Sequence, residues 1–206
     1  MTAQSRDIFT YKKQKYNLSG EEYIDSPFDI YSFGFKPFSP ATSLHRGYIA
    51  SFAKNRNRQL ILRNLSVFHE DSSGQKAPKI NGKYPEIIEE VAWLGEVKGD
   101  RFYYEYKNVD LSLDYTGRLL ISEGRIGRSC IHKGLQSSAS YETVIELTFK
   151  NGLFIRKINL FEMALSLQDQ VPLKNGQKVI PEGDALWEWL YEQYCFPFEH
   201  GFDRFK

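Results

Sequence analysis

Ser129, Cys130 and His132 come nearest, by type and spacing, to a catalytic group in this chain. On a β-strand, side chains two positions apart point to the same side, so the Cys130 thiol and the His132 imidazole could form a nucleophile–base pair. Cysteine catalysis also requires an orienting Asn or Asp and an oxyanion hole, and spacing reveals neither. We therefore expect a buried cysteine beside an exposed histidine and assign no catalytic residue.

Metal and cofactor chemistry has no recognisable pattern in the sequence. The histidines occur singly, without HxxxH, HxH or CxxC spacing, at His45, His69, His132 and His200. The sequence contains no P-loop, no GxGxxG after a strand and no GxSxG elbow. We expect no metal and no cofactor. A carboxylate pair for glycoside or phosphodiester hydrolysis stays open, because such pairs converge only in the fold.

The stretch RFYYEYK, at residues 101–107, is the densest aromatic run and could stack nucleic-acid bases. On a strand, Phe102, Tyr104 and Tyr106 share one face, while Glu105 places a negative charge on the other. The βαββαβ order of an RNA-recognition sheet is missing from the chain. We therefore interpret the run as a strand that packs on a core and has a half-exposed reverse face.

Charge is segregated along the chain. Residues 30–69 contain basic side chains and no acidic one: Lys36, Arg46, Lys54, Arg56, Arg58 and Arg63. Residues 182–203 contain six acids, seven large aromatic residues and no Lys or Arg. Carboxylates among rings are typical of a surface that binds a basic protein, since rings supply contact area and carboxylates supply steering. The alternatives are that the two segments pair with each other or are only solvated.

Composition limits the class of protein. The chain has 206 residues, of which 41% are hydrophobic, 15% aromatic and 26% charged, with a net charge of +1. These values are typical of a globular protein with no general attraction to nucleic acid or anionic membrane. Two cysteines, Cys130 and Cys195, are too few for a disulfide framework. With no apolar leader or long apolar run, we expect a cytoplasmic protein with a single domain over residues 1–206.

The pattern of alternating residues predicts a mainly β fold, an antiparallel curled sheet or partly open barrel with one C-terminal helix. Hairpins are expected around a basic turn in residues 7–19 and around Lys150-Asn151-Gly152, and a tight turn at Asn81-Gly82. Residues 26–40, rich in proline and aromatic residues, should plug one end of the core. The leucine phase slips near Arg63 and Asn64, which predicts a β-bulge. Residues 101–107, 109–115 and 118–126 are expected to form a meander.

The helix is predicted over residues 184–195, with Asp184 as its N-cap. Leu186, Trp189 and Leu190 form one apolar stripe, which should pack on the sheet. A second stripe carries the predicted contacts for a protein partner: Trp187, Glu188, Tyr191 and Glu192. The competing interpretation is that the helix buries both stripes.

Several stretches resemble a loosely defined group of uncharacterised bacterial cytoplasmic proteins: LHRGYIASF, LILRNLSVF, INGKYP and VDLSLDYTGRLLIS. The shared elements are an RGY strand, an alternating leucine strand, a loop with Asn-Gly and Pro, and a strand that ends near Tyr-Thr-Gly. Proteins of this type look like immunity proteins of polymorphic toxin systems. The resemblance supplies no catalytic residue.

We therefore expect a non-catalytic binding protein, in one form an immunity protein that neutralises a basic toxin domain by occluding its active site. An enzyme with a carboxylate or Cys130/His132 site is one alternative. A nucleic-acid or small-ligand binder that uses the basic residues 30–69 is another, and a steep fall of affinity with salt would identify it. The oligomeric state does not follow from the sequence.

Overall fold

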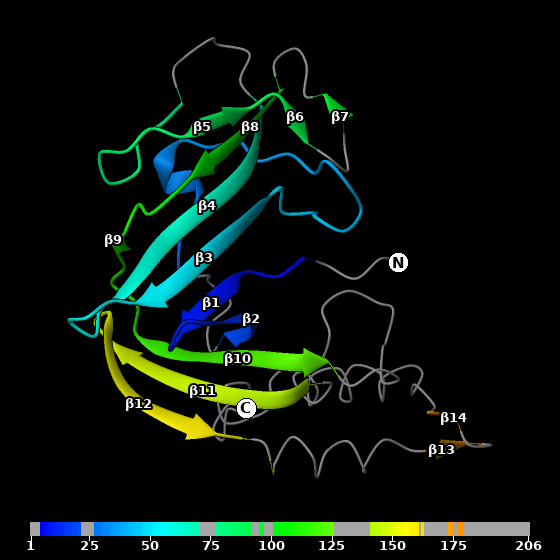
Figure 1. Cartoon of the computed structure of the whole chain (residues 1–206), viewed down its shortest axis with the longest axis vertical. Helices are drawn as coiled ribbons and strands as arrows, with labels where there is room; N and C mark the ends of the chain where they lie inside the picture. Colours follow the sequence, from blue (N-terminus) through cyan, green and yellow to red (C-terminus); the bar gives the residue numbers. More distant parts are fainter. Residues whose placement is uncertain are drawn as a thin grey trace, which may run out of the picture.

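The protein, seen in a computed structural model, is built on one mixed, mostly antiparallel sheet that does not close (Figure 1). The structure describes residues 5–21, 27–70, 77–91, 95–96, 101–125, 141–160, 162, 173–174 and 177–178. The sheet has ten strands, and their spatial order is β12 (Leu153–Asn159), β11 (Tyr141–Lys150), β10 (Gly117–Arg125), β2 (Gln14–Glu21), β1 (Ile8–Tyr11), β3 (Tyr48–Lys54), β4 (Leu60–Glu70), β8 (Arg101–Tyr106) and β5 (Glu86–Ile88), with β9 (Leu111–Ser112) paired to β4.

Smaller elements accompany this sheet. Two short ribbons consist of β6 (Glu90–Val91) with β7 (Gly95–Glu96) and of β13 (Leu173–Lys174) with β14 (Gln177–Lys178). The 3-10 turn η1 spans Tyr31–Phe33. The mainly β prediction is confirmed. The helix predicted over residues 184–195 lies outside the described residues.

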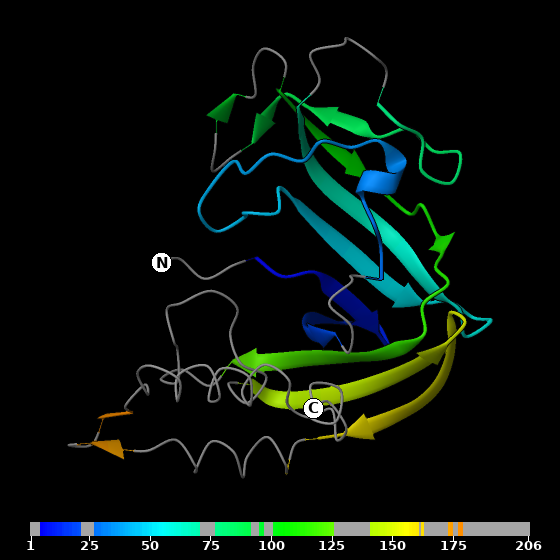
Figure 2. The same cartoon turned by 180° about the vertical axis from the view of Figure 1, so that it is seen from behind.

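One pairing departs from the expected antiparallel sheet. Strands β1 and β3 are parallel, with Phe9 opposite Phe52, whereas every other pairing of the ten-stranded sheet is antiparallel among the residues that the structure describes. The long connection from β2 to β3 allows this, because a parallel pair needs a crossover rather than a tight turn. The parallel pair joins the half built on β3, β4 and β8 to the half built on β2, β10 and β11. Figures 1 and 2 show the two halves at a steep angle to each other.

The predicted bulge lies on β4. Ser51 pairs with Asn64 and Phe52 pairs with Leu62, so Arg63 is the extra residue. The inserted residue shifts the alternation by one position, and as a result Leu62 and Leu65 are both fully buried.

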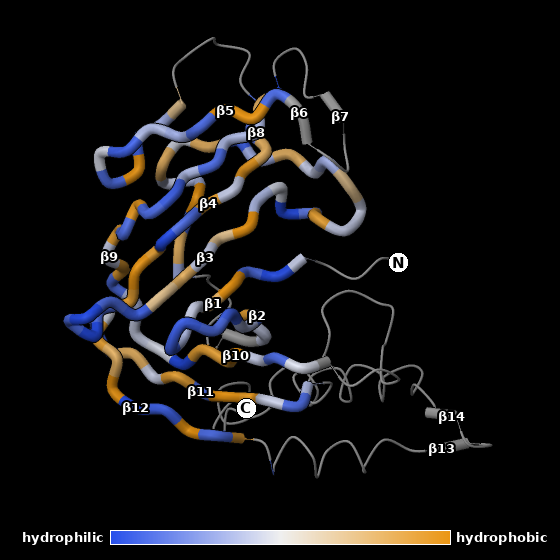
Figure 3. Tube along the Cα trace, viewed as in Figure 1, coloured by the Kyte–Doolittle hydropathy of each residue, from blue (hydrophilic) through white to orange (hydrophobic). Residues whose placement is uncertain are grey.

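Aromatic residues fill the core on the inner face of the bent sheet. The buried rings include Phe9 of β1, Phe52 of β3 and Phe149 of β11, and Figure 3 shows hydrophobic residues in each of these strands. Phe28 and Phe35, from the irregular segment before β3, pack into the same cluster. The prediction that residues 26–40 contribute rings to the core is therefore confirmed for the described part of that segment.

The predicted meander is wrong. Strand β8 pairs with β4 and β5, whereas β10 pairs with β11 and β2, so the two are not neighbours. The chain between them instead runs along β4: the Val109 amide donates to the Arg63 carbonyl at 2.8 Å, and the Leu113 amide donates to the Leu60 carbonyl at 3.0 Å. These hydrogen bonds lead the chain from one half of the sheet to the other.

Turn chemistry was predicted correctly at two sites. Asn81-Gly82 and Asn151-Gly152 both have positive φ at both residues, 49° and 77° in the first turn and 49° and 73° in the second. Two such residues define a type I′ turn, which matches the twist of the strands it joins. Strands β11 and β12 accordingly form the expected hairpin.

Candidate functional site: a basic end of the sheet

Several residues singled out in the sequence lie outside the described residues. They are Cys130 and His132, and the predicted partner contacts Trp187, Glu188, Tyr191 and Glu192. For Cys130 and His132, the catalytic and the packing interpretation both stay predictions. For the other four residues, the partner-binding and the buried-helix interpretation both stay predictions. The candidate site below is built from residues that the structure does describe.

The aromatic run of β8 is a packing element, as predicted. Tyr104 and Tyr106 are buried, and Phe102 stacks on Tyr104 with ring centroids 5.7 Å apart. The Tyr106 hydroxyl donates to the Pro78 carbonyl at 2.6 Å, and burial raises the pKa of that hydroxyl, with a further contribution from Tyr104. On the reverse face Tyr103 lies against Phe68, with ring centroids 4.4 Å apart. These rings therefore pack against the protein and offer no row of faces for bases.

His69, one of the single histidines, has a structural role. Its Nδ1 accepts a hydrogen bond from the Lys36 amide at 2.9 Å, and its ring lies against Phe35 and Tyr104. Across the described ranges, His, Cys, Asp and Glu side chains form no group of three or more that could hold a metal ion. The same part of the chain contains no helix long and apolar enough to span a membrane.

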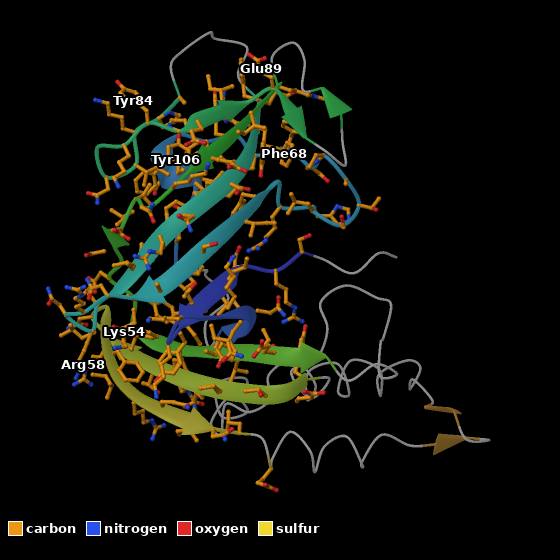
Figure 4. All side chains as sticks on the ribbon, viewed as in Figure 1. Lys54, Arg58, Phe68, Tyr84, Glu89 and Tyr106 are labelled. Atoms are coloured by element: carbon orange, nitrogen blue, oxygen red, sulfur yellow. The ribbon has the colours of Figure 1, made fainter. Side chains whose placement is uncertain are left out.

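Three hairpin turns gather at one end of the sheet. The parallel pairing of β1 with β3 places the β1–β2 turn at residues 12–13 beside the β3–β4 turn at residues 55–59. The β11–β12 turn joins them, because Gln59 forms a bridge with Leu153 and the Leu60 amide donates to the Gly152 carbonyl at 2.8 Å. Figure 4 shows Lys54 and Arg58 close to each other at this end, and Phe68, near the other end of β4, far from both.

This end of the sheet is strongly basic. The parts of the three hairpins nearest the turns, residues 8–18, 48–63 and 147–160, contain no acidic residue. Arg63 pairs with Asp110 and Arg156 pairs with Glu146. The remaining cations have no carboxylate within 4.0 Å in the described part of the chain. We call these residues the basic end: Lys12, Lys13, Lys15, Lys54, Arg56, Arg58, Lys150 and Lys157.

Two rings hold four of these cations in place. The Lys12 and Lys157 ammonium groups lie 5.8 and 5.6 Å from the centre of the Tyr11 ring. The Lys54 ammonium and the Arg58 guanidinium lie 5.4 and 5.6 Å from the centre of the Phe154 ring. Cations at such distances are attracted by the negative face of the ring. Ring contacts thus orient positive charge here without neutralising it.

Arg58 also fastens the edge of the sheet. Its guanidinium donates to the Phe154 carbonyl at 2.8 Å and to the Ile155 carbonyl at 3.4 Å, and its own carbonyl accepts from the Phe154 amide at 2.9 Å. These bonds join the β3–β4 turn to β12 and occupy that part of the exposed edge of β12. Leu153 and Ile155, on the same strand, are 47% and 51% exposed.

Sequence reasoning identified only part of this site. Of the basic residues in 30–69, Arg46 forms a two-point ion pair with the buried Asp7, at 2.8 and 3.0 Å, and Lys36 lies at the far end beside His69. The structure brings Lys54, Arg56 and Arg58 together with lysines of the first and last hairpins. A signal was present, since all three hairpin turns are flanked by basic residues, but the topology was needed to bring them together.

Comparisons with protein-family models, with curated proteins and with solved structures yield no match to this chain. Its residues and geometry therefore carry the functional argument.

Proposed function

We propose that the protein is a non-catalytic binding protein and that its basic end holds a negatively charged partner. The observation that carries the proposal is the pair of rings, Tyr11 and Phe154, that orient four cations with no carboxylate partner among the described residues. Like charges concentrated at one end of the sheet repel each other and lower stability. In the described part of the chain these four cations contact rings and, in the case of Arg58, carbonyl oxygens, but they form no ion pair that would offset the repulsion. A negatively charged partner supplies the missing counter-charge.

Electrostatic attraction of this kind raises the rate of association and makes affinity depend on salt. We expect affinity for the partner to fall steeply as ionic strength rises. We also expect the loss to be largest for the cations that the rings hold, because these lose the least side-chain freedom on binding.

The proposal is tested by comparing tagged wild-type protein with Lys54→Glu/Lys157→Glu in quantitative capture from the native cell extract, followed by measurement of the affinity of each purified partner. Lys79→Glu is the matched control, because Lys79 also lies over a ring, 4.5 Å from the centre of Tyr84, but belongs to a different part of the surface. We expect the control to bind like wild type and the double variant to lose the partner. Equal binding by all three proteins contradicts the proposal, and so does a partner whose loss in the double variant traces to a basic contact surface.

An immunity protein that occludes a toxin is the form of binding suggested by the resemblance described above. The aromatic and acidic residues 182–203 are the sequence feature that supports it, with Trp187, Glu188, Tyr191 and Glu192 as contacts and the predicted helix 184–195 as their frame. Co-expression with the product of a neighbouring toxin gene tests this proposal. Restored growth that Glu188→Lys abolishes supports it, and undiminished killing by the toxin contradicts it.

A further inference from the structure

The turn between β1 and β2 contains residue types that its backbone conformation does not favour. Lys12 and Lys13 are its two central residues, with φ of 50° and 71°, and Tyr11 pairs with Gln14 across it. A two-residue turn of this kind favours Asn and Gly, because other residues bring Cβ too close to the backbone. Among the described residues, the chain uses Asn-Gly at two other turns of this shape, 81–82 and 151–152. In the same part of the chain, this is the one turn that places two lysines in the left-handed region.

No ion pair of the two lysine side chains offsets this strain in the described part of the chain. Both side chains are exposed, and neither has a carboxylate within 4.0 Å in the ranges that the structure covers. Among the described residues, the Lys12 ammonium contacts the Tyr11 ring. Residues that the surrounding structure holds in a disfavoured conformation cluster at functional sites.

The strained cations are not scattered over the molecule. Among described residues other than glycine, positive φ occurs at three asparagines, one aspartate and three basic residues. The basic ones are Lys12, Lys13 and Arg58, and all three belong to the basic end. Asparagine and aspartate tolerate the left-handed region, whereas lysine and arginine have no such preference.

We propose that the Lys12–Lys13 turn is a recognition element for an acidic segment of a protein partner. This inference rests on the proposed function and names the partner's chemistry. The turn supplies charge, and Lys157 supplies more over the shared Tyr11 ring. Leu153 and Ile155, exposed on the strand whose Phe154 ring carries Lys54 and Arg58, supply apolar contact area.

Two observations favour a protein over a nucleic acid. Ammonium and guanidinium groups, not open ring faces, lie over Tyr11 and Phe154, so base stacking has no prepared platform here. Exposed aliphatic side chains next to arginine suit a protein interface, whereas a phosphate backbone offers them nothing to bury against. Because Arg58 already occupies the carbonyls of Phe154 and Ile155, the partner docks through side chains rather than by adding a strand at that point.

The first test replaces the turn with the residues that its shape favours. In Lys12→Asn/Lys13→Gly we expect the urea midpoint to rise, because the strain is relieved, while affinity for an acidic peptide falls roughly tenfold or more as two charge contacts disappear. Lys12→Arg/Lys13→Arg is the charge-keeping control and should retain affinity. A variant that is more stable and binds as well as wild type overturns the inference, and so does one that is less stable than wild type.

The second test distinguishes the partner classes by fluorescence anisotropy. The probes are a labelled peptide that alternates Glu with Leu, one of equal length that alternates Glu with Ser, and an oligothymidylate with the same number of negative charges. We expect the Glu–Leu peptide to bind tightest and Leu153→Ser to reduce its affinity to that of the Glu–Ser peptide. If the oligothymidylate binds tightest and Leu153→Ser changes nothing, the inference fails while the proposed function survives. If no probe binds and capture from the extract does not depend on the basic end, both fail.

Discussion

Gly152 lies where three segments meet, and we predict that Gly152→Ala is among the most destabilising single-methyl additions to this fold. Its amide donates to the Tyr115 carbonyl and its carbonyl accepts from the Leu60 amide, both at 2.8 Å. A Cβ at this position would collide with the Leu113 carbonyl and the Gln59 amide group. The φ of 73° adds a second cost, because an L-residue is disfavoured there.

The magnitude follows from these two terms. The left-handed conformation costs about 1–2 kcal/mol for a residue with a Cβ. Forcing a methyl group into a filled space costs a further 1–3 kcal/mol or so, since the Leu113 backbone is fixed by its own hydrogen bond to Leu60. Gly82→Ala is the matched control: Gly82 also follows an asparagine in the same type of turn, with φ of 77°, but nothing lies within 4 Å of its added Cβ. Gly82→Ala should therefore lose only the free energy that the left-handed conformation costs a residue with a Cβ.

Urea denaturation followed by tryptophan fluorescence and far-UV circular dichroism measures both free energies of unfolding. We expect Gly152→Ala to lose roughly 1–3 kcal/mol more than Gly82→Ala. Adding Gln59→Ala to Gly152→Ala should recover part of the loss, because the Gln59 side chain can be removed and the Leu113 carbonyl cannot. Equal losses for Gly152→Ala and Gly82→Ala would refute the argument that close packing, rather than turn conformation, fixes this residue.

Two further predictions concern polar groups of the fold. Asp7, 2% exposed, accepts hydrogen bonds from Arg46 and from the Ala50 amide, so Asp7→Ala should lower the free energy of unfolding in urea by about 2–4 kcal/mol. Glu86→Gln, at the exposed ion pair with Lys107, should leave the urea midpoint unchanged. Similar midpoints for the two variants would contradict the expected difference between a buried and an exposed ion pair. Burial raises the pKa of Tyr106 above its ordinary value near 10, so above that pH the unfolded state loses the proton first and stability falls as pH rises. Tyr106→Phe should be less stable than wild type at neutral pH, by about 1 kcal/mol, because it loses the hydrogen bond to Pro78. Above pH 10 its stability should fall less steeply than that of wild type, as thermal melts across this range would measure. Parallel pH profiles would show that Tyr106 does not contribute to the loss of stability.

Local rules predicted the elements of the fold well. The Asn-Gly turns at 81–82 and 151–152 and the bulge at Arg63 each follow from one short stretch of residues. These features depend on φ preferences and on a period of two, which the sequence displays directly.

Non-local features were not predictable in the same way. The parallel β1–β3 pair and the separation of β8 from β10 depend on which strand edges pair in the folded chain. The sequence does not decide this, because strands with the same alternating pattern can pair with many different strands. The basic end is a consequence of that topology, since its cations come from three hairpins far apart in the sequence. The Lys12–Lys13 turn is a mixed case. The sequence predicted a hairpin with a basic turn here, but it did not predict that both lysines would adopt positive φ, which lysine does not favour.

The position of the first hairpin in the middle of the sheet has a consequence for folding during synthesis. Strand β2 pairs with β10, so Leu18 can pair with Ile121 only after about half of the chain more has been synthesised. Until then the outer edge of β2 exposes unpaired backbone groups while β1, β3 and β4 can already assemble. Pairings so distant in sequence slow folding, because loop closure costs entropy before any contact is gained. During synthesis the nascent chain therefore carries an open edge of β2 until β10 is made, and this edge can pair with strands of other chains.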